Sequence, residues 1–107
     1  MEAAQVLTAL GDPTRRAVFE QLRSGPCSVA TLAAPLPVSR PAVSRHLKVL
    51  QGAGLVTARQ AGRQTLYAVA PGGLSILQQW VVSFWDDALA ALDEHVSKKG
   101  ASDERPV

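Results

Sequence analysis

Hydrophobic residues recur every three or four positions through the first half of the chain, which is the spacing of one face of an α-helix. Clusters rich in Gly and Pro interrupt this pattern and end helices. The pattern therefore predicts a series of short helices, three of which start at a residue suited to capping. The first covers residues 2–10, the second runs from Asp12-Pro13 to Ser24-Gly25-Pro26, the third from Ser28 to Pro35, and the fourth from Ser39 to Gly52.

The pattern changes after the fourth predicted helix. Residues 55–60 and 64–69 are strand-like runs on either side of Ala61-Gly62-Arg63, where Gly permits the positive φ of a tight turn. We therefore expect a β-hairpin. Pro71-Gly72-Gly73 then breaks the chain, and a strongly apolar helix is predicted from about Leu74 to Ser97.

The third and fourth predicted helices are joined by a tight turn, and the fourth is polar on its outer side, as in a helix-turn-helix. The hairpin that follows has the place of a wing. The predicted fold class is therefore mainly α with a small β-hairpin: a winged helix-turn-helix of four helices, two strands and a final helix.

The helix after Ser39 has two chemically different faces. Val43, Leu47 and Leu50 fall within a narrow apolar arc. The opposite face holds no acid and consists of Arg40, Pro41, Ser44, Arg45 and Lys48. A helix that is buried on one side and rich in Arg, Lys and Ser on the other suits the major groove of DNA. The alternative is an ordinary amphipathic helix with a solvated charged face.

The net charge of +2 hides an asymmetry along the chain. Residues 13–72 carry eight basic residues against a single acid, Glu20, whereas residues 73–107 carry three basic residues and six acids. A basic central segment between acidic ends is expected of a protein whose central segment binds phosphate and whose ends contact a different kind of partner.

The last predicted helix is apolar on two sides. One stripe holds Leu77, Val81, Phe84 and Ala88, and a second, rotated stripe holds Trp85, Leu89, Leu92 and Val96. One stripe can cover the core of its own domain, so the second implies a partner, most simply another copy of the chain. The alternative is that one wide apolar face covers a small core.

In this order, the predicted helices and the hairpin resemble the ArsR family of winged-helix bacterial regulators, over roughly residues 3–97. The resemblance rests on Ala9–Arg16, Val38–Leu50 and Gly54–Val56, and on Arg59, Gly62, Arg63, Leu66 and Tyr67 of the hairpin. It implies double-stranded DNA as partner, a homodimer built from the first and last helices, fourth helices in successive major grooves of a roughly palindromic operator, and repression by blocking the promoter. We therefore expect a DNA-binding and dimerisation domain over residues 1–97 and a disordered C-terminal tail over residues 98–107.

The resemblance also assigns roles to residues of the fourth helix. Ser39, Arg40, Ser44 and Arg45 match positions that face the groove. Arg40 and Arg45 are the candidates for base contacts, because Arg can bind the O6 and N7 atoms of guanine together. Ser39 and Ser44 could contact phosphate or base. Pro41 could pack on a thymine methyl group or simply begin the helix.

The remaining polar residues are assigned more weakly. Lys48 is expected at phosphate, and Arg63 at the hairpin tip, with Arg59 close by, at phosphate or in the minor groove. His46 matches a histidine common in the family, and packing is favoured over DNA contact for it. For Arg15 and Arg16, which start the second helix, a solvated surface position or local ion pair and DNA contact are equal alternatives.

The implied dimer interface combines apolar residues of the first and last helices. They are Val6, Leu7, Leu10, Leu77, Val81, Phe84, Trp85, Ala88, Leu89 and Leu92. The aromatic residues among them are expected to form interface core, and a pocket there for an unidentified small-molecule effector is the alternative.

Metal sensing, for which the family is known, is not expected here, and neither is a cofactor. The paired cysteines of the metalloid sensors are missing because Cys27 is the only cysteine. Asp86, Asp87 and His95 do not reproduce the ligand spacing of the zinc-sensing helix. A thiol- or metal-responsive repressor that uses Cys27 stays an alternative.

Other function classes have less support. No catalytic triad, metal-hydrolase spacing or phosphate-binding glycine loop is visible, so an enzyme is not expected. The chain has no apolar run long enough for a membrane span and no secretory signal, and its single cysteine agrees with a cytoplasmic location. The rival reading is a winged-helix module for protein–protein assembly, a class that tends to lose the basic face kept here.

Overall fold

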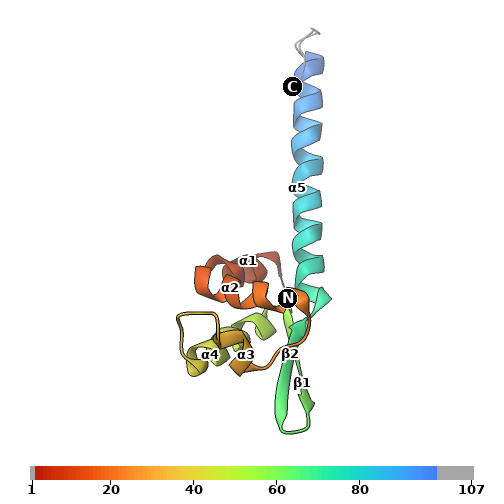
Figure 1. Cartoon of the computed structure of the whole chain (residues 1–107). Helices are drawn as coiled ribbons and strands as arrows, with labels where there is room; N and C mark the ends of the chain where they lie inside the picture. The colour runs from red at the N-terminus through yellow and green to blue at the C-terminus, as the bar shows by residue number, and fades with distance from the viewer. Residues whose placement is uncertain (1, 99–107) are drawn as a thin grey trace. The chain divides into compact units, whose positions relative to one another are not determined.

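The computed structural model describes residues 2–98, with side chains described through Glu94. The elements follow one another as α1 (Ala3–Gly11), α2 (Pro13–Gln21), the short 3₁₀ helix η1 (Leu22–Ser24), α3 (Val29–Ala33), α4 (Arg40–Gly52), β1 (Val56–Ala61), β2 (Gln64–Val69) and α5 (Pro71–Lys98) (Figure 1). This order confirms the predicted winged helix-turn-helix. The expected tail lies outside the described residues except for Lys98, which is the last residue of α5.

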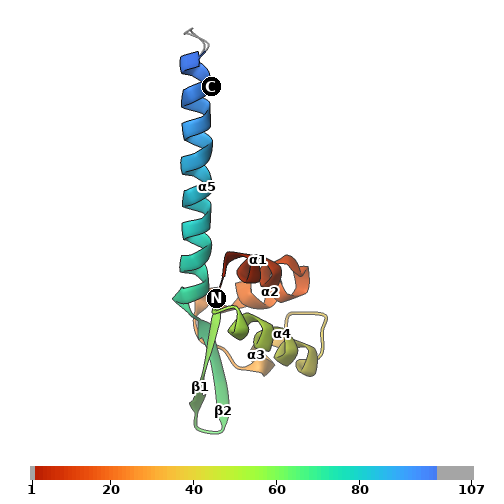
Figure 2. The same ribbon diagram turned by 180° about the vertical axis from the view of Figure 1, so that it is seen from behind.

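The chain divides into two parts, one up to Leu77 and one from Gln78 onward. In the first part, α1 and α2 lie above α3 and α4 in the front and back views (Figures 1 and 2). Each helix turns an apolar face inward. The largest fully buried side chains are Val6, Val18, Leu22, Leu32, Val43, Leu47, Leu50 and Leu55. Burying each of them stabilises the fold by about 1.5–3 kcal/mol relative to leaving it in water.

The three predicted capping residues start their helices as expected. They are Asp12 for α2, Ser28 for α3 and Ser39 for α4. In each case a side-chain oxygen accepts the backbone N–H three residues further on, at 2.9 Å for Asp12 and 3.3 Å for the two serines. The caps satisfy donors that the first helical turn leaves without a partner.

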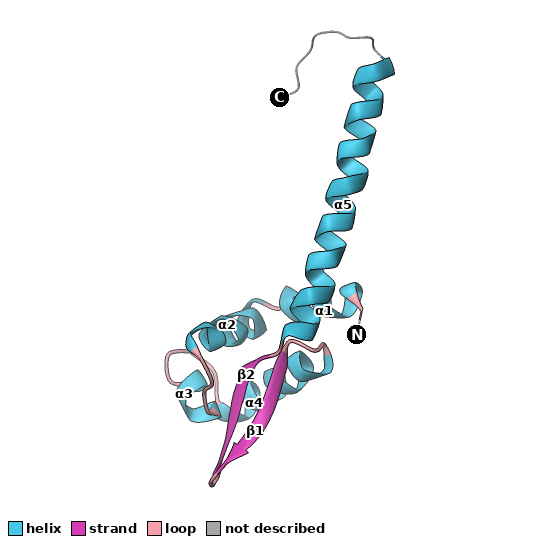
Figure 3. Ribbon diagram, turned by 90° about the vertical axis from the view of Figure 1, so that its right-hand side faces the viewer, coloured by secondary structure: helices cyan, strands magenta, loops and turns pink. Residues whose placement is uncertain are grey.

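The wing is a two-stranded antiparallel hairpin (Figure 3). Its pairing runs from Val56 opposite Val69 to Ala61 opposite Gln64. The turn is therefore the two residues Gly62-Arg63, one fewer than predicted, because Ala61 still belongs to β1. Gly62 has a φ of 65°, the left-handed conformation that two-residue hairpin turns require.

A third short segment joins the hairpin at β2. The backbone N–H of Cys27 donates to the Tyr67 carbonyl oxygen at 2.9 Å, and the Tyr67 N–H donates back to Cys27 at 2.8 Å. This bridge fixes the loop between η1 and α3 to the wing. The sequence gives no sign of it, because a single paired residue has no periodicity.

The last helix begins earlier than predicted. Pro71-Gly72-Gly73 forms its first turn instead of a break before it. Proline is tolerated at this position because the first helical N–H needs no intrahelical partner. Among the described residues, no helix combines the length and apolar character needed to cross a bilayer.

Candidate nucleic-acid interface

The helix α4 presents its two faces as the sequence predicts. Val43, Leu47 and Leu50 are fully buried and attach the helix to the core. The residues on the other face are all exposed: Arg40, Pro41, Ser44, Arg45 and Lys48. The buried face holds the helix rigidly, so the exposed side chains project from a fixed scaffold. This is the arrangement that reading a DNA groove requires.

The connection between α3 and α4 is compact. The backbone N–H of Leu36 donates to the Ala33 carbonyl oxygen at 3.0 Å, and Leu36 and Val38 pack against the core. Pro35 and Pro37 stiffen the same turn because their φ angles are fixed. The turn therefore holds α3 and α4 in one helix-turn-helix unit.

Within the part of the chain whose side chains are described, no acid lies within ion-pair distance of the α4 cations Arg40, Arg45 and Lys48. Their charges are therefore available to phosphate or to base edges. The one ion pair found in this part joins Arg23 and Glu20, at 3.1 Å, and it lies on α2 and η1.

Ser39 has its predicted capping role besides the expected contact to DNA. Its Oγ accepts the Ala42 N–H at 3.3 Å as the N-cap of α4. The hydroxyl hydrogen remains free to donate to a phosphate or base acceptor. Ser44, one turn further on, is exposed and makes no such cap contact among the described hydrogen bonds.

His46 is half-buried on the edge of α4. The pKa of the nearby Asp12 carboxyl group, the cap of α2, is lowered mainly by the hydrogen bond from the Arg15 backbone N–H, with a smaller contribution from the charge of His46. Packing and DNA contact both stay open as roles of His46.

Arg15 and Arg16 bind the end of α1. The Arg15 Nε donates to the Ala9 carbonyl oxygen at 2.6 Å, and the Arg15 Nη2 donates to the Thr8 carbonyl oxygen at 3.1 Å. The Arg16 Nη1 donates to the Leu10 carbonyl oxygen at 2.8 Å. These are carbonyls that the last helical turn leaves without partners. Both arginines therefore hold α1 against α2, a role that neither sequence alternative described.

The wing carries the second group of exposed cations. Arg63 is exposed in the tip turn, and Arg59 is exposed on β1 opposite Leu66. The Gln60 Nε2 donates to the Gly62 carbonyl oxygen at 3.4 Å, and the Thr65 hydroxyl donates to Gln60 at 3.1 Å. The first contact joins β1 to the turn and the second joins the two strands, so together they stiffen the tip and hold Arg63 at its end.

Cys27 is half-buried in the bridge to β2, and its Sγ donates to the Gly25 carbonyl oxygen at 3.4 Å. Among the described residues, no group of three His, Cys, Asp or Glu side chains is gathered closely enough to hold a metal ion.

The residues of the predicted dimer surface divide by burial. Val6 is fully buried in the core of its own chain, so it has no surface to offer a partner, and Leu10 and Leu77 pack partly against that core. The other predicted residues are exposed: Leu7, Val81, Phe84, Trp85, Ala88, Leu89 and Leu92. Phe84 and Trp85 expose 63% and 59% of their area. Such an expanse of apolar side chains is unusual for a surface that only water covers.

Beyond Leu77, two large apolar residues of α5 that are exposed lie outside the predicted stripes. They are Trp80, whose ring stacks on Phe84 with centroids 6.1 Å apart, and Val82. The signal for them was present in the sequence, since residues 80–85 are almost entirely apolar. An assignment to narrow stripes overlooked them because the apolar surface extends around most of the helix.

Comparison with known proteins places these features in context. Residues 10–59 match a family described as a helix-turn-helix domain. The chain is 48% identical over 92 residues to the HTH-type transcriptional regulator Rv2034 of Mycobacterium tuberculosis, a match that covers 86% of each protein. It is 40% identical over 88 residues to the HTH-type transcriptional repressor SmtB of Mycobacterium tuberculosis, covering 81% of this chain and 65% of the repressor.

A solved structure shows the same fold. The ArsR-like transcriptional regulator from Rhodococcus sp. RHA1 superposes with a TM-score of 0.71 at 35% sequence identity. The match covers 86% of this chain and 90% of the regulator.

Proposed function

Because this chain belongs to the ArsR family of DNA-binding transcriptional regulators, we propose that it acts as a homodimeric repressor of a roughly palindromic operator. In this proposal residues 1–97 serve both DNA binding and dimerisation. The α4 helix of each copy enters a major groove, and the wing reaches the adjacent backbone.

One observation carries the proposal: the exposed face of α4 holds Arg40, Arg45 and Lys48, none of which pairs with an acid among the described side chains, on a helix whose other face is fully buried. Exposed cations on a rigid helix favour phosphate and base edges as partners. Arg40 and Arg45 are proposed to read bases, Ser39, Ser44 and Pro41 to support them, and Lys48 to bind phosphate. Arg59 and Arg63 of the wing are proposed at phosphate or in the minor groove.

Dimerisation is supported by the apolar surface of α5. Trp85, Leu89 and Leu92 are each more than half exposed in the single chain. Burying apolar area of this kind is the main stabilising contribution in protein association. A symmetric pair would use the same surface twice and would present two α4 helices to DNA. Two such helices fit half-sites about one helical turn, roughly 34 Å, apart.

Selection of bound sequences from a random DNA library tests this function. We expect enrichment of two inverted half-sites at a fixed spacing, and an affinity whose logarithm falls with log salt by about 0.9 per neutralised phosphate. Salt-independent binding, or enrichment of unpaired single sites, would contradict it. A repeat with zinc and with an oxidant would show the thiol- or metal-responsive alternative as a loss of the enriched sequences in one arm. Complete failure to retain DNA would favour the protein–protein module.

A further inference from the structure

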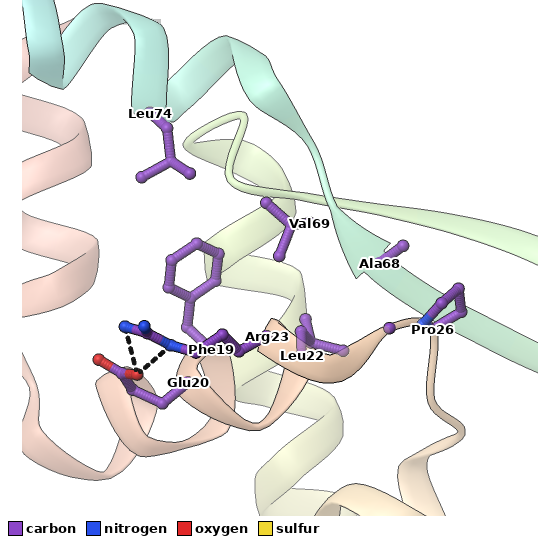
Figure 4. A pocket seen from close by; sticks show the side chains of 9 residues that line it. Phe19, Glu20, Leu22, Arg23, Pro26, Ala68, Val69 and Leu74 are labelled. Carbon is purple, nitrogen blue, oxygen red and sulfur yellow. Dashed lines mark hydrogen bonds and ion pairs between the residues drawn. The ribbon is translucent and has the colours of Figure 1, made fainter.

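A pocket opens on the first part of the chain, and none of the residues that line it belongs to α4. Its volume is about 570 Å³, and α2, η1, the Gly25-Pro26 loop, the end of β2 and the start of α5 line it (Figure 4). Sites for small molecules are typically about 300–1,000 Å³, mostly apolar, with a few polar groups that orient the ligand. This pocket has both the size and the composition of such a site.

Three apolar side chains form its interior. Phe19 from α2, Val69 from β2 and Leu74 from α5 point toward the same space (Figure 4). Phe19 packs partly against the core, while Val69 and Leu74 expose 37% and 38% of their area. In a well-packed core these side chains would be in contact. An apolar ligand can fill the space between them, and its binding would bury apolar surface of both the ligand and the side chains.

One polar pair stands at the rim. The Arg23 guanidinium donates from Nε to the Glu20 Oε1 at 3.2 Å, and its Nη2 lies 3.1 Å from the same oxygen (Figure 4). A charged ligand would meet a like charge as well as an opposite one here. A neutral ligand with one hydrogen-bond donor meets a carboxylate that can accept, and it leaves the ion pair intact.

The wall of the pocket is bound directly to the segment that follows α4. The Ala70 N–H donates to the Leu55 carbonyl oxygen at 2.9 Å, and the Gly73 N–H donates to Gly54 at 2.7 Å. Val69 pairs with Val56 in the hairpin. If a bound ligand displaces Val69 or Leu74, the movement is therefore transmitted through the adjacent backbone to the end of α4 and the base of the wing.

We infer that this pocket binds a neutral, predominantly apolar small molecule with one hydrogen-bond donor. We further infer that binding of this ligand changes the positions of α4 and the wing. The regulatory half of this inference rests on the proposed DNA-binding function. The binding half does not, since it concerns only the pocket and the backbone attached to it.

Indole is a suitable probe because it is neutral, apolar and carries one N–H donor. We expect titration of the ¹⁵N-labelled full-length protein to move the amide signals of Phe19, Val69 and Leu74 in a saturable way, together with those of Gly54 and Leu55. Ala68→Leu adds bulk to the pocket wall and should weaken indole binding at least tenfold. The matched control is Ala58→Leu, since Ala58 pairs with Tyr67 on the same hairpin and does not line the pocket.

The outcomes separate the two proposals. Non-saturable shifts, or equal binding by the Ala68→Leu variant, would overturn the site. So would contacts from a second copy of the chain that occupy the pocket in the unliganded protein. Shifts confined to the pocket, with Gly54 and Leu55 unmoved, would overturn the coupling. Operator affinity is measured first without indole. If the protein does not bind DNA under this condition, the result counts against the proposed function alone. With that function intact, saturating indole should change operator affinity about fivefold or more.

Discussion

The backbone N–H of Gly73 donates a 2.7 Å hydrogen bond to the carbonyl oxygen of Gly54, which joins the first turn of α5 to the segment after α4. The two backbones are so close that a Cβ on Gly73 would lie 2.7 Å from the Ala53 carbonyl oxygen and 2.9 Å from Gly54 atoms. Gly54 itself adopts a φ of 74°. The end of the proposed recognition helix and the start of the proposed dimerisation helix are thus held by a contact that only glycine at position 73 permits.

Gly73→Ala should therefore lower the free energy of unfolding. Its Cβ meets backbone rather than a flexible side chain, and overpacking of this kind costs about 1–3 kcal/mol. Chemical denaturation gives the value. Gly52→Ala is the control, because a Cβ there meets nothing within 4 Å and Ala favours the helix. Equal free energies for the wild type and the Gly73→Ala variant would show that the contact yields without cost.

Arg15→Ala should destabilise the fold while leaving the salt dependence of DNA binding unchanged. The Arg15 guanidinium is bound to the carbonyl oxygens of Ala9 and Thr8, and hydrogen bonds from a charged group contribute about 1.5–3 kcal/mol. Thermal or chemical unfolding measures the first effect and a salt titration of DNA affinity the second. Arg23→Ala, which breaks only an exposed ion pair, should cost less than about 1 kcal/mol. A shallower salt slope for Arg15→Ala would instead place this residue at phosphate.

Arg45→Ala should separate base reading from phosphate binding on α4. Loss of a bidentate contact to guanine is expected to cost about 1–3 kcal/mol on the preferred sequence and to relax the choice of base at one position per half-site. Lys48→Ala should weaken all sequences alike and reduce the salt slope by about 0.9. Affinities for operator and random DNA, measured for both variants, decide the matter. Identical losses on both kinds of DNA would contradict the assignment of Arg45.

Trp85→Ala should disrupt the proposed dimer. Trp85 is 59% exposed in the single chain, and buried aromatic residues at the centre of an interface often account for about 2 kcal/mol or more of binding. Sedimentation velocity should show the variant shifted toward monomer, with operator affinity reduced in parallel. Gln79→Ala, on an exposed polar position of the same helix, serves as the control. A natural protein that sediments as a single monomeric species would rule the dimer out.

Asp12 predicts a specific response to acid. The hydrogen bond from the Arg15 backbone N–H lowers the pKa of its carboxyl group below the ordinary value of 3.8. Because the folded-state pKa is the lower one, the stabilisation is complete above about pH 3.8 and is lost as the pH falls through the lowered value. Asp12→Asn keeps a capping oxygen but cannot ionise. The difference in unfolding free energy between the wild type and this variant should therefore be constant near neutral pH and change only in strong acid.

The sequence by itself determined the features that depend on neighbouring residues. The caps Asp12, Ser28 and Ser39, the buried arc of α4 and the hairpin around Gly62 follow from helix periodicity, capping and turn chemistry, which act over a few positions. The cationic face of α4 follows in the same way, because a helix places every third or fourth residue on one side.

Only the tertiary structure decided the features that join distant segments. Val6 lies in the core rather than on the surface, Arg15 binds the end of α1, Cys27 pairs with Tyr67, and Gly73 contacts Gly54. The pocket beside Phe19 and Leu74 belongs to the same group. In each case the physical cause is the packing of segments that lie far apart along the chain, and no local spacing of residue types encodes which backbone atoms will meet.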